Sequence, residues 1–121
     1  TEDGLKPKDR PLRRKAGILL GHLSEIEAYN VYAAGELLCD AQKYEEAIEV
    51  FQDVINRFPE SDQAVNAAVN VASAYMALEE YRKAAEEFQQ VVQKYGEMPR
   101  FSPQVDFSRQ QLEALEEARV L

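Results

Sequence analysis

Few residues of this chain are of types that do chemistry: among 121 residues there is one histidine, His22, and one cysteine, Cys39. A cysteine nucleophile needs a base within reach, and these two residues could meet only through the fold. Cys39 stands among apolar residues of a predicted helix, where a small buried thiol is ordinary packing. The sequence also has no glycine-rich phosphate loop and no paired cysteines. It therefore predicts no catalytic residues and a protein that is not an enzyme.

Acidic clusters recur along the chain, and carboxylates three or four residues apart share one face of a helix. The clusters contain Glu45, Glu46, Glu49, Glu79, Glu80, Glu86, Glu87, Glu113, Glu116 and Glu117. No Glu-x-x-His motif accompanies them, although helix-based carboxylate metal sites use one. We interpret the clusters as solvated helix faces, so the sequence predicts no metal ligands and no cofactor.

Charge is unevenly distributed along the chain. The formal net charge is −8, but residues 1–15 carry +3, which leaves −11 on the remainder. An acidic body argues against nucleic acid as a partner, because attraction to phosphate needs clustered Lys and Arg. Residues 1–10 are predicted to form a flexible basic arm. We interpret the basic segment Lys6 to Lys15 as a tail or as a neutraliser of the acidic body, with contact to nucleic acid or lipid headgroups as the alternative.

Apolar residues recur at three- and four-residue spacing in several segments, as is typical of amphipathic helices. The spacing predicts helices over residues 24–40, 44–58, 62–78, 81–95 and 103–120, and a short helix over 12–20 that ends at Gly21. Ser24 and Glu27 form a candidate capping box, and Ser61 is a candidate N-cap. Gly96 suits a left-handed C-cap. The longest apolar run, AGILLGHL at residues 16–23, is too short to cross a bilayer, so no transmembrane segment is predicted.

Two of these segments repeat one phrase, YEEAIEVF (Tyr44–Phe51) and YRKAAEEF (Tyr81–Phe88), 37 residues apart. The upstream helices align at the same offset. Small residues recur at positions 35, 47, 72 and 84, where they allow neighbouring helices to approach closely. Large residues at positions 38, 51, 75 and 88 fill the space between turns. The pattern predicts two stacked helix pairs.

The repeated positions resemble the tetratricopeptide repeat, or TPR. The first copy has Gly35, Leu38, Tyr44, Ala47, Phe51 and Pro59, and the second has Ala72, Tyr75, Tyr81, Ala84 and Phe88. With the phrase RFPES (Arg57–Ser61), the 37-residue period resembles TPR proteins of the bacterial cell envelope, which are Tol-Pal-associated or act in outer-membrane assembly. The chain departs from the pattern at Val31 and Ala68, where a Trp or large apolar residue is usual, and at Gly96, which replaces the closing proline.

The resemblance implies an all-α fold, a right-handed α-α superhelix with two full helix-turn-helix repeats plus flanking helices. It places the repeats at about 25–60 and 62–98 and a capping helix at about 103–120, in one domain over residues 11–121. It further implies a protein-protein interaction scaffold whose first helices line a concave face. Residues of that face expected to bind a partner are Tyr29, Tyr32, Glu36, Asp40, Asn66, Val69, Asn70 and Ser73, with Cys39 and Met76 on the same helices.

The chemistry of these residues suggests what the partner is. Glu36 and Asp40 would repel an acidic tail, and no Lys or Arg occupies the positions at which one TPR groove grips a carboxylate. We therefore expect a basic or neutral apolar peptide or protein. The alternative is a structural or self-associating segment of a longer TPR solenoid without its own groove, because two repeats are fewer than usually make such arrays stable. Bacterial periplasm and cytoplasm both remain open as the compartment.

Overall fold

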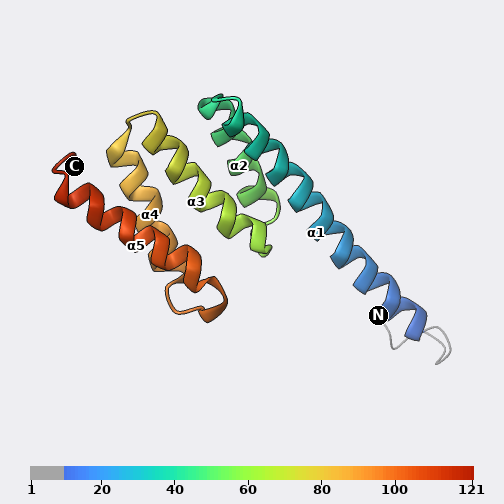
Figure 1. Ribbon diagram of the computed structural model, residues 1–121. Coiled ribbons are helices and arrows are strands. Elements are labelled where there is room, and N and C mark those ends of the chain that lie inside the picture. The colour runs from blue at the N-terminus through green and yellow to red at the C-terminus, as the bar shows by residue number, and fades with distance from the viewer. Residues whose placement is uncertain (1–9) are drawn as a thin grey trace.

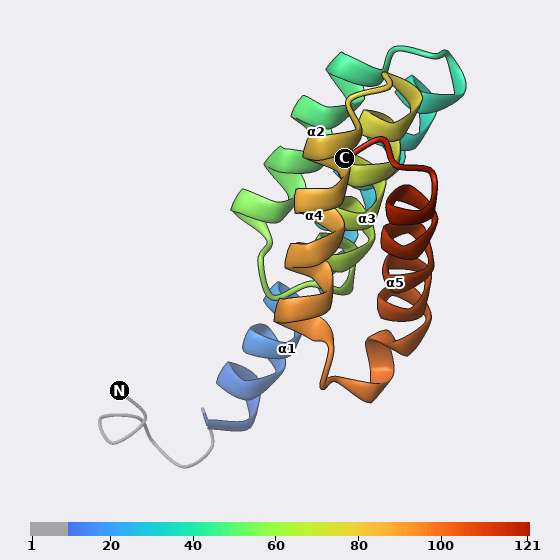
Figure 2. The same ribbon diagram turned by 90° about the vertical axis from the view of Figure 1, so that its left-hand side faces the viewer.

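The computed structural model describes residues 10–121, with side chains from residue 21 onward. The flexible arm predicted for residues 1–10 lies, apart from Arg10, outside the described residues. The described chain is all-helical and has a TPR-like helical repeat (Figure 1). Its elements are α1 (Arg10–Asp40), α2 (Tyr44–Arg57), α3 (Asp62–Ala77), α4 (Tyr81–Tyr95), the 3-10 turn η3 (Pro99–Phe101) and α5 (Ser102–Glu117). Figure 2 shows α2 and α4 on one side of the array and α3 and α5 on the other.

The first helix corrects two predictions. The short helix over 12–20 and the helix over 24–40 are one continuous helix, α1, and Gly21 does not end it. A glycine inside a helix costs only about 1 kcal/mol relative to alanine, and no glycine in the described chain has a positive φ. The capping box at Ser24 and Glu27 is also wrong, because both residues lie inside α1, where backbone N–H groups already have helical partners.

The turns after α1 and α3 share one backbone conformation. Gln42 and Glu79, which are 37 residues apart, have φ angles of 61° and 60°. In the first turn the N–H of Gln42 donates to the carbonyl of Cys39 at 2.9 Å, and the N–H of Lys43 donates to the carbonyl of Leu38 at 2.8 Å. The second turn has the corresponding bonds at 3.0 and 2.9 Å. This pair of bonds defines the Schellman motif, so the sequence repeat is also a repeat of backbone geometry.

The end of α4 differs from these turns. Gly96 has φ −58° and ψ −26°, so the predicted left-handed C-cap is wrong. Glycine is needed there for another reason: a Cβ at Gly96 would collide with the carbonyl oxygen of Val92. The close approach of the backbone, and not a positive φ, therefore accounts for this glycine.

The repeated small and large residues build the core as predicted. Phe51 and Phe88 are fully buried, and so are Ala47 and Ala84 beside them on the same helices. A Cβ at Gly35 would lie 2.5 Å from a ring atom of Phe51, which means that α1 approaches the ring as closely as a residue without a side chain allows. The duplicated phrase is therefore the packing surface that joins each second helix to its neighbours.

The last helix occupies the place of a first helix in a further repeat. α5 has 16 residues, as α3 does, and begins 40 residues after it, so η3 accounts for the three residues beyond the 37-residue period. Arg119, at the end of α5, has φ 59°, close to the value at Glu79. The helix packs on α3 and α4 through a core of Val65, Val91, Tyr95, Phe101 and Val105. One end of α3 is thereby covered.

Candidate partner-binding groove

A groove lies between the first helices of the two repeats, at the C-terminal ends of α1 and α3. It has a volume of about 340 Å³ and is lined by Glu36, Cys39, Asp40, Tyr44, Asn70, Ser73, Ala74 and Ala77. Four of the eight predicted partner-binding residues are among these: Glu36, Asp40, Asn70 and Ser73. The Schellman turn after α1 positions Tyr44 at the same site, because it returns the chain directly into α2.

The groove combines an acidic rim with small residues. Glu36 and Asp40 lie one helical turn apart on α1 and are both exposed. Ala74 is buried and Ala77 is exposed, and both are too small to fill the space. Cys39 is partly buried, and burial raises the pKa of its thiol, with further contributions from the negative charges of Asp40 and Glu36. The thiol is therefore protonated near neutral pH, which makes it an uncharged part of the wall.

Asn70 lines the groove, and Tyr32, which does not line it, is hydrogen-bonded to Asn70. The Asn70 side-chain amide donates to the Tyr32 hydroxyl at 2.9 Å, which links α3 to α1. The Tyr32 ring packs on Phe51 with 5.6 Å between ring centroids. Burial raises the pKa of Tyr32, and the charge of Glu36 adds to the shift. The structure thus gives both residues a role in fixing the spacing of the two helices beside the groove.

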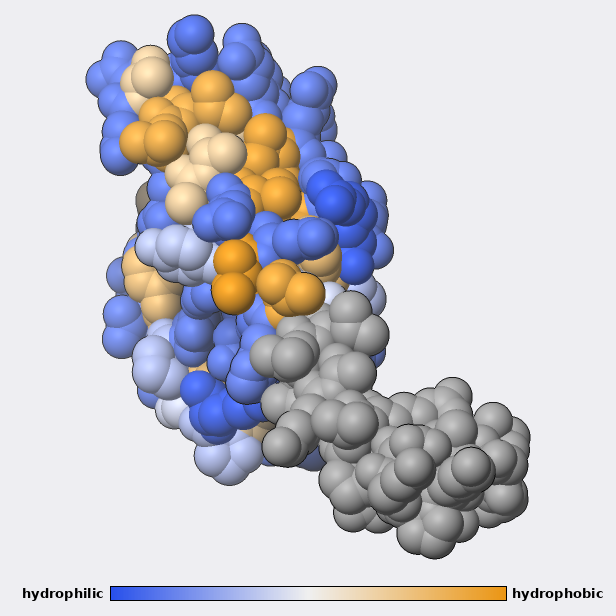
Figure 3. All heavy atoms as spheres, turned by 90° about the vertical axis from the view of Figure 1, so that its right-hand side faces the viewer, coloured by the Kyte–Doolittle hydropathy of each residue, from blue (hydrophilic) through white to orange (hydrophobic). Residues whose placement is uncertain are grey.

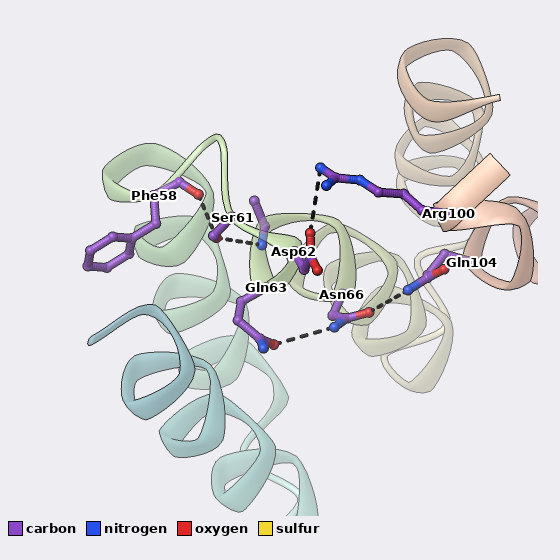
Figure 4. Close-up of polar contacts among 8 residues, drawn as sticks. Phe58, Ser61, Asp62, Gln63, Asn66, Arg100 and Gln104 are labelled. Carbon is purple, nitrogen blue, oxygen red and sulfur yellow. Dashed lines mark hydrogen bonds and ion pairs between the residues drawn. The ribbon is translucent and has the colours of Figure 1, made fainter. Parts of the chain in front are cut away.

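Asn66 and Val69 lie away from the groove, at the interface of α3 with α5. The side-chain oxygen of Asn66 accepts a hydrogen bond from the side-chain amide of Gln104 at 3.0 Å. The side-chain amide of Asn66 donates to the side-chain oxygen of Gln63 at 3.4 Å (Figure 4). Val69 packs against the cores that α5 helps to form. Tyr29, the remaining predicted residue, is 55% exposed but does not line the groove.

The N-terminus of α3 is fixed by the residue predicted to cap it. The Ser61 hydroxyl donates to the carbonyl of Phe58 at 2.7 Å and accepts from the N–H of Ala64 at 3.2 Å. Figure 4 shows Arg100 reaching from η3 toward Asp62, with 3.6 Å between the charged atoms. These contacts hold the end of α3 opposite the groove.

A second depression lies between α2 and α4, on the other side of the array. It has a volume of about 310 Å³ and is lined by Gln52, Ile55, Asn56, Ala68, Glu87, Gln90, Val91, Lys94 and Tyr95. Burial raises the pKa of Glu87, and the nearby charge of Glu86 adds to the shift. None of the predicted partner-binding residues lines this depression. Its wall carries both the carboxylate of Glu87 and the ammonium of Lys94, so it favours neither a positively nor a negatively charged ligand.

The part of the chain with described side chains contains no group of His, Cys, Asp and Glu residues that could hold a metal ion. Among the described helices, none has a stretch both long and apolar enough to span a membrane.

The repeated helix pairs, their matching turns and the shared core place the chain among the TPR-like helical-repeat proteins, a class that serves protein-protein interaction. The model of the YfiO family, described as an outer membrane lipoprotein, matches residues 24–109, which is 86 of 121 residues. The chain belongs to this family, and the resemblance to TPR proteins of the cell envelope is confirmed. The family is typically non-enzymatic. Neither the curated proteins nor the solved structures include a match.

Proposed function

We propose that the protein binds a basic or neutral apolar segment of a partner protein in the groove between α1 and α3. The observation that supports this most directly is the pairing of Glu36 and Asp40 on the rim of a recess lined by small residues. An extended segment would place a Lys or Arg between the two carboxylates and an apolar side chain against Ala74. The family's description supports a setting at the outer membrane.

The proposed binding mode draws on two kinds of interaction. Charge attraction at an exposed rim steers the partner and selects its sign more than it adds affinity, whereas contact with the alanine-lined wall supplies apolar burial. Asn70 has its amide engaged by Tyr32, and its carbonyl oxygen can accept a hydrogen bond from a peptide backbone. The hydroxyl of Ser73 both donates and accepts. We therefore expect short peptides to bind weakly and with marked salt dependence.

Labelled decapeptides in which Lys alternates with Ala test the proposal, with the same peptides carrying Glu as the comparison. Fluorescence anisotropy should show binding of the Lys peptide only, and binding should weaken on raising salt from about 50 to about 500 mM. The double variant Glu36→Gln, Asp40→Asn should weaken binding about tenfold, because it removes both rim charges.

The matched control is Glu45→Gln, Glu49→Gln, which removes two exposed carboxylates at the same spacing from α2, outside the groove. It should leave the affinity for the Lys peptide unchanged. Equal binding of the Lys and Glu peptides would contradict the proposal, and so would equal weakening by the two double variants.

A further inference from the structure

The face of α1 that points away from the other helices carries a line of apolar side chains. Leu23, Ile26 and Leu37 are 53%, 55% and 69% exposed. Asn30 is exposed and Ala33 is partly exposed between them. We call these five residues the outer stripe; Figure 3 shows hydrophobic side chains gathered along this face. Ala28 and Gly35, which are buried against the rest of the fold, lie on the opposite side of the helix. The outer stripe is therefore not part of the repeat core.

The spacing of the outer stripe is that of a coiled-coil seam and not only of a wide amphipathic face. Its residues alternate steps of three and four, with Asn30 at the centre. The sequence extends the same spacing toward the N-terminus with Leu12, Ala16 and Leu19, in a segment whose backbone belongs to α1. About four heptads are thus covered, which is the length over which such a pattern indicates a coiled coil. A single polar residue such as Asn30 in a seam lowers the stability of a coiled coil.

Charge decides how a second helix would run along this seam. The N-terminal end of α1 holds Arg10, Arg13, Arg14 and Lys15, whereas Glu36 and Asp40 stand at its other end, next to an acidic body. A parallel copy would bring like charges together at both ends. An antiparallel copy would set each basic end beside the acidic end of the other and would keep the two bodies, at −11 each beyond residue 15, far apart.

The seam also has an antiparallel register that matches residue by residue. With Leu23 opposite Ile26 of a second copy, Leu37 falls opposite Leu12 and Ala16 opposite Ala33. Every pair joins residues of similar size, except that Asn30 faces Leu19. The two copies are related by a two-fold axis, which is the symmetry of most soluble dimers.

We propose that the protein forms an antiparallel homodimer through the outer stripe of α1. The dimer leaves both copies of the groove between α1 and α3 in place, with their openings on separate bodies. The proposal does not rest on what the groove binds, although Glu36 lies both on the rim of the groove and beside the seam. The occupant is a second copy rather than an anionic membrane, because Glu27 and Glu36 flank the described part of the stripe and would repel lipid phosphates.

Sedimentation velocity of the full chain tests this between about 2 and about 400 µM. The mass should rise with concentration from 13.8 kDa toward twice that value. The variant Leu23→Glu, Ile26→Glu should stay monomeric over this range, because it places four carboxylates at the centre of the seam. Met98→Glu, at a similarly exposed apolar residue outside α1, should dimerise like the wild type.

Three further experiments test the orientation and the polar centre. Lys15→Glu should weaken the dimer about tenfold, and adding Glu36→Lys should restore it. Asn30→Leu should tighten association, because the seam loses its buried amide. In a Cys39→Ser background, a mixture of Leu12→Cys and Leu37→Cys chains should oxidise mainly to the mixed disulfide.

Several results would overturn the proposal. A monomer at every concentration would do so, as would equal dimerisation of the Leu23→Glu, Ile26→Glu variant. Preferential formation of disulfides between two Leu12→Cys chains would overturn the antiparallel orientation. Binding to vesicles of anionic phospholipid by a chain that stays monomeric, and loss of that binding in the stripe variant, would assign the stripe to a membrane instead. The Lys-peptide assay is repeated with the Leu23→Glu, Ile26→Glu variant. Binding of the Lys peptide by this variant would show that the groove works whether or not the chain dimerises.

Discussion

Replacing Gly35 with alanine tests how closely the first repeat is packed. The added Cβ would meet three ring atoms of Phe51 at 2.5, 2.8 and 2.9 Å. All three contacts are shorter than side chains tolerate, and the ring is fully buried, so it has no open space into which it can turn. Overpacking of this kind costs about 1–3 kcal/mol, whereas alanine gains about 1 kcal/mol over glycine as a helix former.

Because all three contacts fall below van der Waals distance, we place the packing cost near the upper end of its range. The variant should then lose about 1–2 kcal/mol in the free energy of unfolding, measured by urea denaturation. Repeating the substitution in a Phe51→Leu background supplies the decisive comparison. Without the ring, the helix-propensity gain should prevail and Gly35→Ala should become neutral or stabilising.

Gly21→Ala is the matched control in the same helix, because a Cβ there meets nothing within 4 Å. It should raise helix content by circular dichroism without lowering the free energy of unfolding. If Gly35→Ala is as stable as the wild type, or equally destabilising with and without the Phe51 ring, then α1 and α2 are not held at the distance that the glycine allows.

Three further predictions concern other parts of the fold. Ala84→Leu should cost about 1–3 kcal/mol in urea unfolding, since Ala84 is fully buried, whereas Ala114→Leu on the exposed face of α5 should be nearly neutral. Gln42→Gly should stabilise by up to about 1 kcal/mol, because φ is 61° there; an unchanged midpoint would contradict the assigned turn. The raised pKa of Glu87 means that the folded state disfavours its charged form. The contribution of Glu87 to the free energy of unfolding is therefore fully present below its unfolded pKa, where the carboxyl is protonated, and is lost as pH rises through its folded pKa. Glu87→Gln should therefore raise the melting temperature at about pH 7 and leave it unchanged at about pH 4.

The core could be predicted because its residues recur in both repeats. Phe51 and Phe88, which are 37 residues apart, are both fully buried, since each fills the same place in its repeat. The extent of α1 could not be predicted in this way. Gly21 and Ser24 look like boundary residues, but each disfavours a helix only weakly, and no proline interrupts the segment between them and the end of α1.

Only half of the predicted partner-binding residues line the groove, because α5 makes the surroundings of α3 different from those of α1. The 37-residue alignment treats α1 and α3 as equivalent, but α5 covers α3 where no described helix covers α1. Asn66 therefore bonds with Gln104, and Tyr29 at the aligned position stays exposed. Tyr44 lines the groove although the repeat pattern assigned it to packing, and Ala74 and Ala77 line it although no pattern in the sequence singled them out. The position of Tyr44 directly after a tight turn is the signal that could have identified it.

Cys39 turns the groove into a site that can be followed chemically without knowing the partner. It is the only cysteine in the sequence, so a thiol reagent modifies one position in each chain. Its raised pKa makes the reaction slow near neutral pH and faster in alkaline solution. A partner that fills the groove would shield the sulfur, and the drop in labelling rate would report the fraction of chains occupied. The side chain that first suggested a nucleophile thus serves as a reporter of binding.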